Sequence, residues 1–143
     1  LAAAAASVAS RFPGCGLLVE EQVAYSGPEF IVGGFRDPVF GPAVMVGAGG
    51  ILTELYRDVA FRLVPCSERE ALSMLRELSV YPVLEGFRGS PLDAGALAGV
   101  VARVSAIIEE LGEAFSQLDV NPIVFTRSGW TVLDAKLVLR RTP

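Results

Sequence analysis

The chain has 143 residues, of which 52% are hydrophobic and 20% charged, and its net charge is −4. This length suits one domain with a packed core, and the absence of a basic cluster argues against a nucleic-acid partner. Charged residues interrupt every apolar run before the ~18 residues that cross a bilayer, so no membrane association is expected. With no His, and with Cys15 far from Cys66, neither a zinc site nor a disulfide framework is expected, and reduced thiols in a cytoplasmic protein are favoured.

The Ala-rich start of the chain, LAAAAASVASRF, predicts a helix over residues 1–11, which Pro13, Gly14 and Gly16 bring to an end. It lacks the basic and bulky apolar regions of a signal peptide. The chain does not begin with Met, and a start within a helix is typical of a processed or excised piece of a longer protein.

A block rich in Val, Ile and Phe follows, with turn residues between its segments. GLLVEEQVA (16–24), EFIVGGFRD (29–37) and PAVMVGA (42–48) predict three antiparallel strands. The next segment, ILTELYRDVAFRLVP (51–65), has an ambiguous period and predicts a fourth strand over residues 59–63.

Two helices are predicted after this block. Ser67 and Glu70 form the S-x-x-E pattern of a capping box, which indicates a helix to about Leu78. YPVLEGFRGSP (81–91) reads as a loop, and a longer helix begins at Asp93. Its apolar residues form one stripe: Leu97, Val100, Val101, Val104, Ile107, Ile108 and Leu111. With two final strands, this order predicts an α+β fold with a mainly antiparallel sheet and flanking helices.

The final stretch, LDVNPIVFTRSGWTVLDAKLVL (118–139), predicts a hairpin with TRSG as its loop. In that register Asn121 lies opposite Asp134, and Asp119 lies opposite Lys136. Alternate strand residues share a face, so these four side chains point to one side. The other side receives Val120, Val124, Leu133 and Leu137. A two-residue loop shifts the partners and keeps the shared face, whereas a loop of odd length would separate the four side chains.

Two interpretations of this polar face remain open on spacing alone. Two carboxylates and an amide oxygen suit a hard cation such as Mg²⁺, which also accepts water and substrate phosphate as ligands. Alternatively, Asp119 and Lys136 form an ordinary cross-strand ion pair, while Asn121 before Pro122 only caps the turn out of the strand.

LDVNPIVF followed by VLDAKLVL resembles the metal-binding strand pair of the ATP-grasp domain in ADP-forming acyl-CoA synthetases. This family is similar to the β subunit of succinyl-CoA synthetase. GLLVEEQV, the long segment from GPEFIVGGFRD to AFRLVP, and YPVLEGFRG also resemble that family, in the same order. The resemblance extends over residues 16–139.

The resemblance implies that Asn121 and Asp134 coordinate Mg²⁺ between nucleotide phosphates. Asp119 stands where related enzymes often carry Glu near the metal and the phosphates. The resemblance therefore implies direct contact with the metal less strongly for Asp119 than for Asn121 and Asp134. This set is the implied metal site.

For the nucleotide, the resemblance implies that LLVEEQV is the hinge that holds adenine and ribose. Glu20 and Glu21 are therefore candidates, and strand alternation leaves open which of them faces the nucleotide. Glu29 is a further candidate for the same cleft. Gly49 and Gly50 of the GAGG stretch are implied to face the phosphates.

The implied reaction joins acyl-CoA, ADP and phosphate to acid, CoA and ATP, with ATP or ADP as substrate and Mg²⁺ as cofactor. The resemblance implies that residues 1–143 form a single partial domain. This domain is the C-terminal portion of an ATP-grasp fold without its N-terminal subdomain. The CoA-binding and phosphohistidine-bearing domains or subunits are then partners, and the fragment alone is expected to be inactive. The alternatives are a non-catalytic remnant used for nucleotide sensing or subunit docking, and a purely structural domain.

Overall fold

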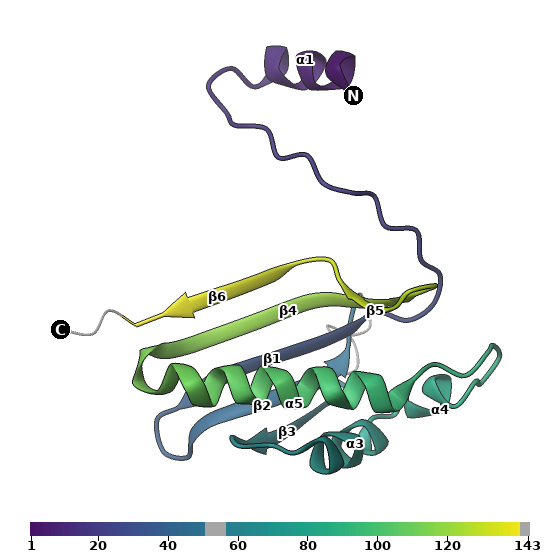
Figure 1. Cartoon of the computed structure of the whole chain (residues 1–143), viewed down its shortest axis with the longest axis vertical. Coiled ribbons are helices and arrows are strands. Elements are labelled where there is room, and N and C mark those ends of the chain that lie inside the picture. Colours follow the sequence, from purple (N-terminus) through teal and green to yellow (C-terminus); the bar gives the residue numbers. More distant parts are fainter. Residues whose placement is uncertain (51–56, 141–143) are drawn as a thin grey trace.

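The computed structural model describes residues 1–50 and 57–140. Within these ranges the strands form one six-stranded antiparallel sheet in the order β3-β2-β1-β4-β5, with β6 also paired to β4 (Figure 1). The strands run over Phe30–Asp37 (β1), Gly41–Ala48 (β2), Val59–Leu63 (β3), Phe115–Thr126 (β4), Gly129–Val132 (β5) and Ala135–Leu139 (β6). The predicted α+β class and antiparallel sheet are confirmed, as is the strand over residues 59–63.

Helices α3 and α5 cover one face of the sheet, and among residues 1–50 and 57–140 no helix packs on the other face (Figure 1). The helices run over Ala2–Arg11 (α1), Glu68–Glu77 (α3), Tyr81–Leu84 (α4) and Ala94–Leu111 (α5), with a short 3-10 turn at Gly112–Ala114 (η1). The described ranges contain no helix that combines the length and the apolar character needed to cross a membrane.

Side-chain caps fix where the two main helices begin. The Ser67 hydroxyl accepts the N–H of Glu70 at 3.3 Å, and the Glu70 carboxylate accepts the N–H of Ser67 at 2.8 Å, which confirms the predicted capping box. Asp93 caps α5 by accepting the N–H of Ala96 at 2.8 Å. Both helices therefore start at the residues that the sequence indicates.

The core lies between α3, α5 and the sheet face that they cover. Its largest fully buried side chains include Phe30, Phe115, Met74, Leu75, Leu97, Ile108 and Ile123. Gly34 of β1 is part of this contact, because a Cβ at that position would collide with the Ile108 side chain. Helix α5 thus approaches β1 more closely than a side chain at Gly34 would permit.

Trp130 ties the β4–β5 hairpin to the start of α5. Its indole N–H donates to the Asp93 carbonyl at 2.6 Å. Its ring packs edge-on against Phe30 and Phe125, with centroids 5.4 and 5.0 Å away. Through Trp130 the hairpin is therefore fixed to the start of α5 on the helix-covered side of the sheet.

The strand predicted over residues 16–24 does not form. The segment runs as extended chain away from the sheet toward α1, and its apolar residues are exposed, with Leu18 at 82% (Figure 1). Strand-forming side chains need a neighbouring backbone to pair with. β2 and β4 already occupy both edges of β1, so the strand nearest in the sequence offers this segment no free edge.

Three smaller predictions also need correction. The predicted loop over residues 81–91 contains α4, whose first turn accommodates Pro82. The hairpin turn is tighter than expected, because Thr126 pairs with Gly129 and only the two residues between them form the turn. The strand after the turn is divided into β5 and β6.

Val124 lies on a different face from the one predicted. The pairing of β1 with β4 shifts between Phe30–Ile123 and Val32–Val120. An irregularity of this kind reverses the alternation of side chains beyond it. Ile123 consequently joins Val120 in the core, and Val124 turns to the opposite side.

Replacing Ser67 by Ala should destabilise the protein by about 1 kcal/mol, because the α3 capping box is lost. The hydrogen bonds from Ser67 lower the pKa of Glu70 from 4.5. A carboxyl whose pKa falls on folding contributes stability above its unfolded pKa, and this contribution is lost as pH falls through the folded value. The difference between wild type and Ser67→Ala in urea unfolding should therefore narrow below about pH 4.5.

Ser73→Ala, an exposed site within α3, is the matched control and should not destabilise. Equal losses from both substitutions would contradict the role of the cap.

Candidate functional site

The predicted polar face forms on β4 and the chain that returns beside it. Asp119 pairs with Lys136, and the Asn121 N–H donates to the Asp134 carbonyl at 3.0 Å. Their neighbour Val120 is in the core, so Asp119 and Asn121 lie on the face without helices. Asp119 is half-buried, and the other three residues are exposed. The register counted from the sequence is thereby confirmed.

The donor chemistry of this face fits a hard cation. Asp119, Asn121 and Asp134 offer two carboxylates and an amide oxygen, and Asp134 uses one carboxylate oxygen to accept the Ala135 N–H at 2.8 Å. In the described part of the chain no three His, Cys, Asp or Glu side chains are grouped to hold a metal by themselves. Mg²⁺ needs no such cage, because it commonly binds one or two carboxylates together with water and phosphate oxygens.

The alternative interpretation, a cross-strand ion pair, is not what the side chains form. Asp119 and Lys136 are register partners, yet the ion pairs among residues 1–50 and 57–140 are Arg36–Glu113 and Arg62–Glu77. The Asp119 carboxylate is therefore not neutralised by direct contact with Lys136.

Glu29, Gly49 and Gly50 meet where β2 ends and β1 begins. The Gly49 N–H donates to the Glu29 carbonyl at 2.6 Å. A Cβ at Gly49 would lie 2.9 Å from the Glu29 carbonyl carbon, and one at Gly50 would lie 3.0 Å from Glu29 Oε2. Gly50 also has φ +64°, a conformation that favours glycine. The absence of side chains at both positions is what lets this loop reach the Glu29 carboxylate.

The other oxygen of that carboxylate has a partner in the preceding segment. The Tyr25 hydroxyl donates to Glu29 Oε1 at 2.5 Å. This hydrogen bond to a carboxylate raises the pKa of the Tyr25 phenol. Tyr25 thus links the extended segment to the start of β1.

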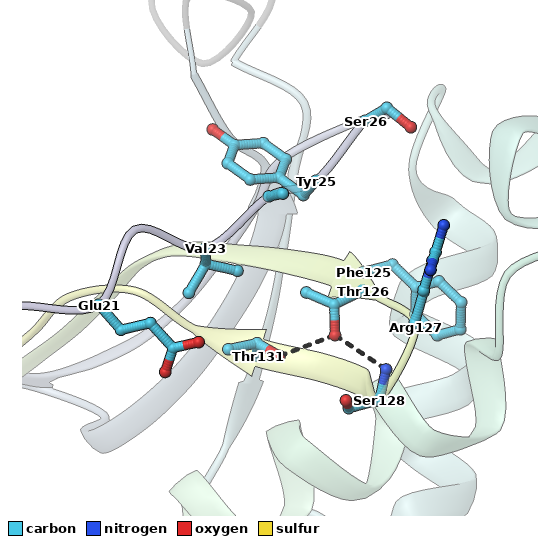
Figure 2. A pocket seen from close by; sticks show the side chains of 10 residues that line it. Glu21, Val23, Tyr25, Ser26, Phe125, Thr126, Arg127, Ser128 and Thr131 are labelled. Atoms are coloured by element: carbon cyan, nitrogen blue, oxygen red, sulfur yellow. Dashed lines mark hydrogen bonds between the residues drawn. The ribbon is translucent and has the colours of Figure 1, made fainter.

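A cavity of about 1060 Å³ lies between the extended segment and the β4–β5 hairpin (Figure 2). Its lining residues are Glu21, Val23, Ala24, Tyr25, Ser26, Phe125, Thr126, Arg127, Ser128 and Thr131. Both side chains are exposed, and Glu21 lines the cavity whereas Glu20 is not part of the lining. The structure thus distinguishes two neighbours that strand alternation alone left equivalent.

The lining residues of the hairpin, from Phe125 to Thr131, were not identified from the sequence. Their side chains form no local motif, and they become a wall only because the segment before β1 crosses the hairpin. The one sequence signal is the recurrence of Thr126 and Thr131 beside the turn, where the two hydroxyls lie 3.2 Å apart.

These groups lie at one end of the sheet. Phe30 pairs with both Ala48 and Ile123, so Glu29 and the glycine loop lie beyond this row toward the β4–β5 turn, and Asn121 lies on the other side of it, two residues before Ile123 along β4. Along β4, Asn121 and Phe125 are four residues apart, which corresponds to about 13 Å. A ligand that extends from the cavity can therefore reach the polar face.

The ATP-grasp domain model matches residues 2–139, and the chain belongs to this family. The resemblance inferred from the sequence motifs is thereby confirmed.

Several relatives are ADP-forming acetate–CoA ligases. The chain is 44% identical over 114 residues to the β subunit of acetate–CoA ligase I from Pyrococcus furiosus, covering 79% of this chain and 49% of the relative. It is 42% identical over 125 residues to acetate–CoA ligase I from Archaeoglobus fulgidus, covering 87% of this chain and 18% of the relative. The chain therefore spans half or less of the length of these relatives.

A similar solved structure is the acetyl-CoA synthetase 1 of Ca. Korarchaeum cryptofilum. It superposes with a TM-score of 0.75 at 44% identity, covering 82% of this chain and 55% of that chain. That protein is in complex with coenzyme A and Mg-AMPPCP, with its phosphohistidine segment pointing towards the nucleotide binding site.

Gly49→Ala should destabilise the fold by about 1–3 kcal/mol, because the new Cβ has to push the Glu29 backbone away. Gly89→Ala is the matched control, since a Cβ there meets nothing within 4 Å, and its effect should stay within about 0.5 kcal/mol. Urea unfolding measures both values. Two equal changes would contradict the close approach of the loop to Glu29.

Proposed function

We propose that this chain is the nucleotide- and magnesium-binding part of an ADP-forming acyl-CoA synthetase. The reaction is acyl-CoA + ADP + phosphate ⇌ acid + CoA + ATP. The observation that carries this proposal is that one sheet holds two contacts along the same stretch of β4: Asn121 with Asp134, and, further toward the cavity, Glu29 with the glycine loop. The ATP-grasp family membership and the names of the relatives support it.

Asn121 and Asp134 would hold Mg²⁺, with Asp119 beside them. When bound, the ion neutralises phosphate charge and aligns the phosphates for transfer. The side chains of Asn121 and Asp134 contribute oxygens from a stretch of chain fixed by the hydrogen bond between their backbones. These residues bind and orient, and none of them is a nucleophile.

The nucleoside would occupy the cavity, with Glu21 and Glu29 available to accept hydrogen bonds from its hydroxyl or amino groups. The backbone at Gly49 and Gly50 would lie against the phosphates, because glycine permits close approach, although the Gly49 N–H itself is used by the Glu29 carbonyl. Glu20, which is outside the cavity lining, is assigned no contact with the ligand.

The remaining steps are assigned to other parts of the enzyme. The sequence contains no His, so a phosphohistidine has to come from another domain or subunit, as does CoA binding. In this proposal residues 1–143 act as one jaw of a two-part nucleotide clamp, in a cytoplasmic enzyme.

Asp134→Asn tests the metal role in the complete protein that contains this chain. The substitution removes one negative charge with little change in shape, so turnover with Mg-ADP should fall on the order of 100-fold or more. Turnover is measured as ATP formed from acyl-CoA, ADP and phosphate at several Mg²⁺ concentrations. The residual activity should require more Mg²⁺.

Glu109→Gln, an exposed carboxylate on α5, is the charge-matched control and should leave turnover unchanged. Near-normal turnover of Asp134→Asn at limiting Mg²⁺ would sink the metal assignment. Calorimetric binding of Mg-ADP to a protein that lacks synthetase activity would instead favour a nucleotide-sensing role.

A further inference from the structure

The Tyr25 side chain is the hydrogen-bonding partner of the Glu29 carboxylate, and the sequence motifs assign no role to it. The phenol oxygen lies 2.5 Å from Glu29 Oε1. Tyr25 comes from the extended segment, four residues before Glu29, and lines the cavity together with Ser26 (Figure 2). The contact therefore joins the wall of the cavity to the residue that borders the glycine loop.

The two oxygens of Glu29 are used differently. Oε1 accepts the Tyr25 hydroxyl, while Oε2 lies beside Gly50, 3.0 Å from the point where a Cβ would be. The carbonyl of Glu29 is held separately by the Gly49 N–H. The backbone of Glu29 is thus fixed by the glycine loop, and the direction of its carboxylate is fixed by Tyr25.

A glutamate side chain has several rotatable bonds and loses considerable conformational freedom when it is held in one direction. A residue that binds a ligand gains affinity when this freedom is lost before the ligand arrives. Glu29 is half-buried, so the packing around it leaves its carboxylate partly free to move. A directed hydrogen bond is the contact able to select one orientation.

We propose that Tyr25 is a positioning residue, whose hydroxyl holds the Glu29 carboxylate so that Oε2 is presented at the glycine loop to the incoming nucleotide. This inference rests on the nucleotide role proposed for Glu29. Tyr25 acts through Glu29 and is assigned no contact with the reacting atoms.

The test is Tyr25→Phe in the complete protein that contains this chain. The change removes one oxygen and keeps the ring that lines the cavity. The KM for ADP should rise about 5-fold, since one hydrogen bond to a charged group is lost and part of its value was orientation. The KM for acyl-CoA and kcat should stay within about 2-fold, because the side chain touches neither the acyl substrate nor the phosphates.

Tyr81→Phe is the matched control. Tyr81 is half-buried against the core, far in the sequence from the cavity, and loses the same oxygen. Its KM for ADP should remain that of wild type. An equal rise in both variants would show that the loss of a phenol weakens the protein generally, and would overturn the proposal.

A double-mutant cycle with Glu29→Ala separates positioning from direct binding. Glu29→Ala removes the carboxylate and keeps the carbonyl that accepts the Gly49 N–H, and by itself it should raise the KM for ADP. Adding Tyr25→Phe to it should change the KM no further. Additive effects would mean that Tyr25 acts independently of Glu29, and the proposal would fall.

The outcomes also distinguish this proposal from the function on which it rests. If Glu29→Ala raises the KM and Tyr25→Phe does not, the positioning role is wrong and the nucleotide site stands. If Glu29→Ala has no effect, the positioning role falls with the role of Glu29, while Asp134→Asn still decides the metal site separately.

Discussion

Strand β4 is hydrogen-bonded along both of its edges, and the rest of the structure is arranged around this constraint. β1 lies along one edge, and β5 and β6 lie along the other. Each of its two faces carries a separate set of side chains. Val120 and Ile123 enter the core beneath α5, while Asp119 and Asn121 point to the opposite side of the sheet. One strand thus supplies the centre of the core and the centre of the candidate site. The backbone of Asp119 and Asn121 is therefore held by the same strand that supplies the core.

Charge explains why such an arrangement calls for a ligand cation. Glu21, Glu29, Asp119 and Asp134 are four of the 16 acidic residues of a chain with 12 basic residues and a net charge of −4. Like charges gathered in one region repel, and they attract cations. Arg36 and Arg62 pair with Glu113 and Glu77 elsewhere, so the cations near these carboxylates are Arg127 in the cavity lining and Lys136 opposite Asp119. In the proposed function, a nucleotide carrying Mg²⁺ would bring positive charge to the carboxylates and phosphate oxygens to the glycine loop.

The sequence predicted most completely those features that depend on short-range chemistry. The Ser67 capping box, the Asp93 cap and the β4 pairings of Asp119 and Asn121 follow from neighbours and from the regular period of helix and strand. The extended segment 16–24 was predicted wrongly because its side chains favour a strand, while the deciding factor is whether a neighbouring edge is free. The face of Val124 was missed for a similar reason, since the shift of register appears only when β1 is beside β4.

The residues of the candidate site also divide into those that short-range sequence patterns predict and those that depend on tertiary contacts. Asn121, Asp134, Glu29 and the two glycines belong to motifs and could be named in advance, whereas the contribution of Tyr25 and of the hairpin wall could not. Those contacts form only where the segment before β1 crosses the hairpin.

The site therefore joins a firmly held part of the molecule to a loosely held one. In residues 1–29 no side chain is fully buried, whereas the adjoining strands supply much of the core. Segments with so few buried contacts open at low cost in free energy, so a ligand held between them and the sheet has to order them at its own expense. The hydrogen bond from the Gly49 N–H to the Glu29 carbonyl already spans the two parts and lowers this expense. The Tyr25 hydroxyl adds to this connection through the Glu29 carboxylate, at the point where the extended chain enters the sheet.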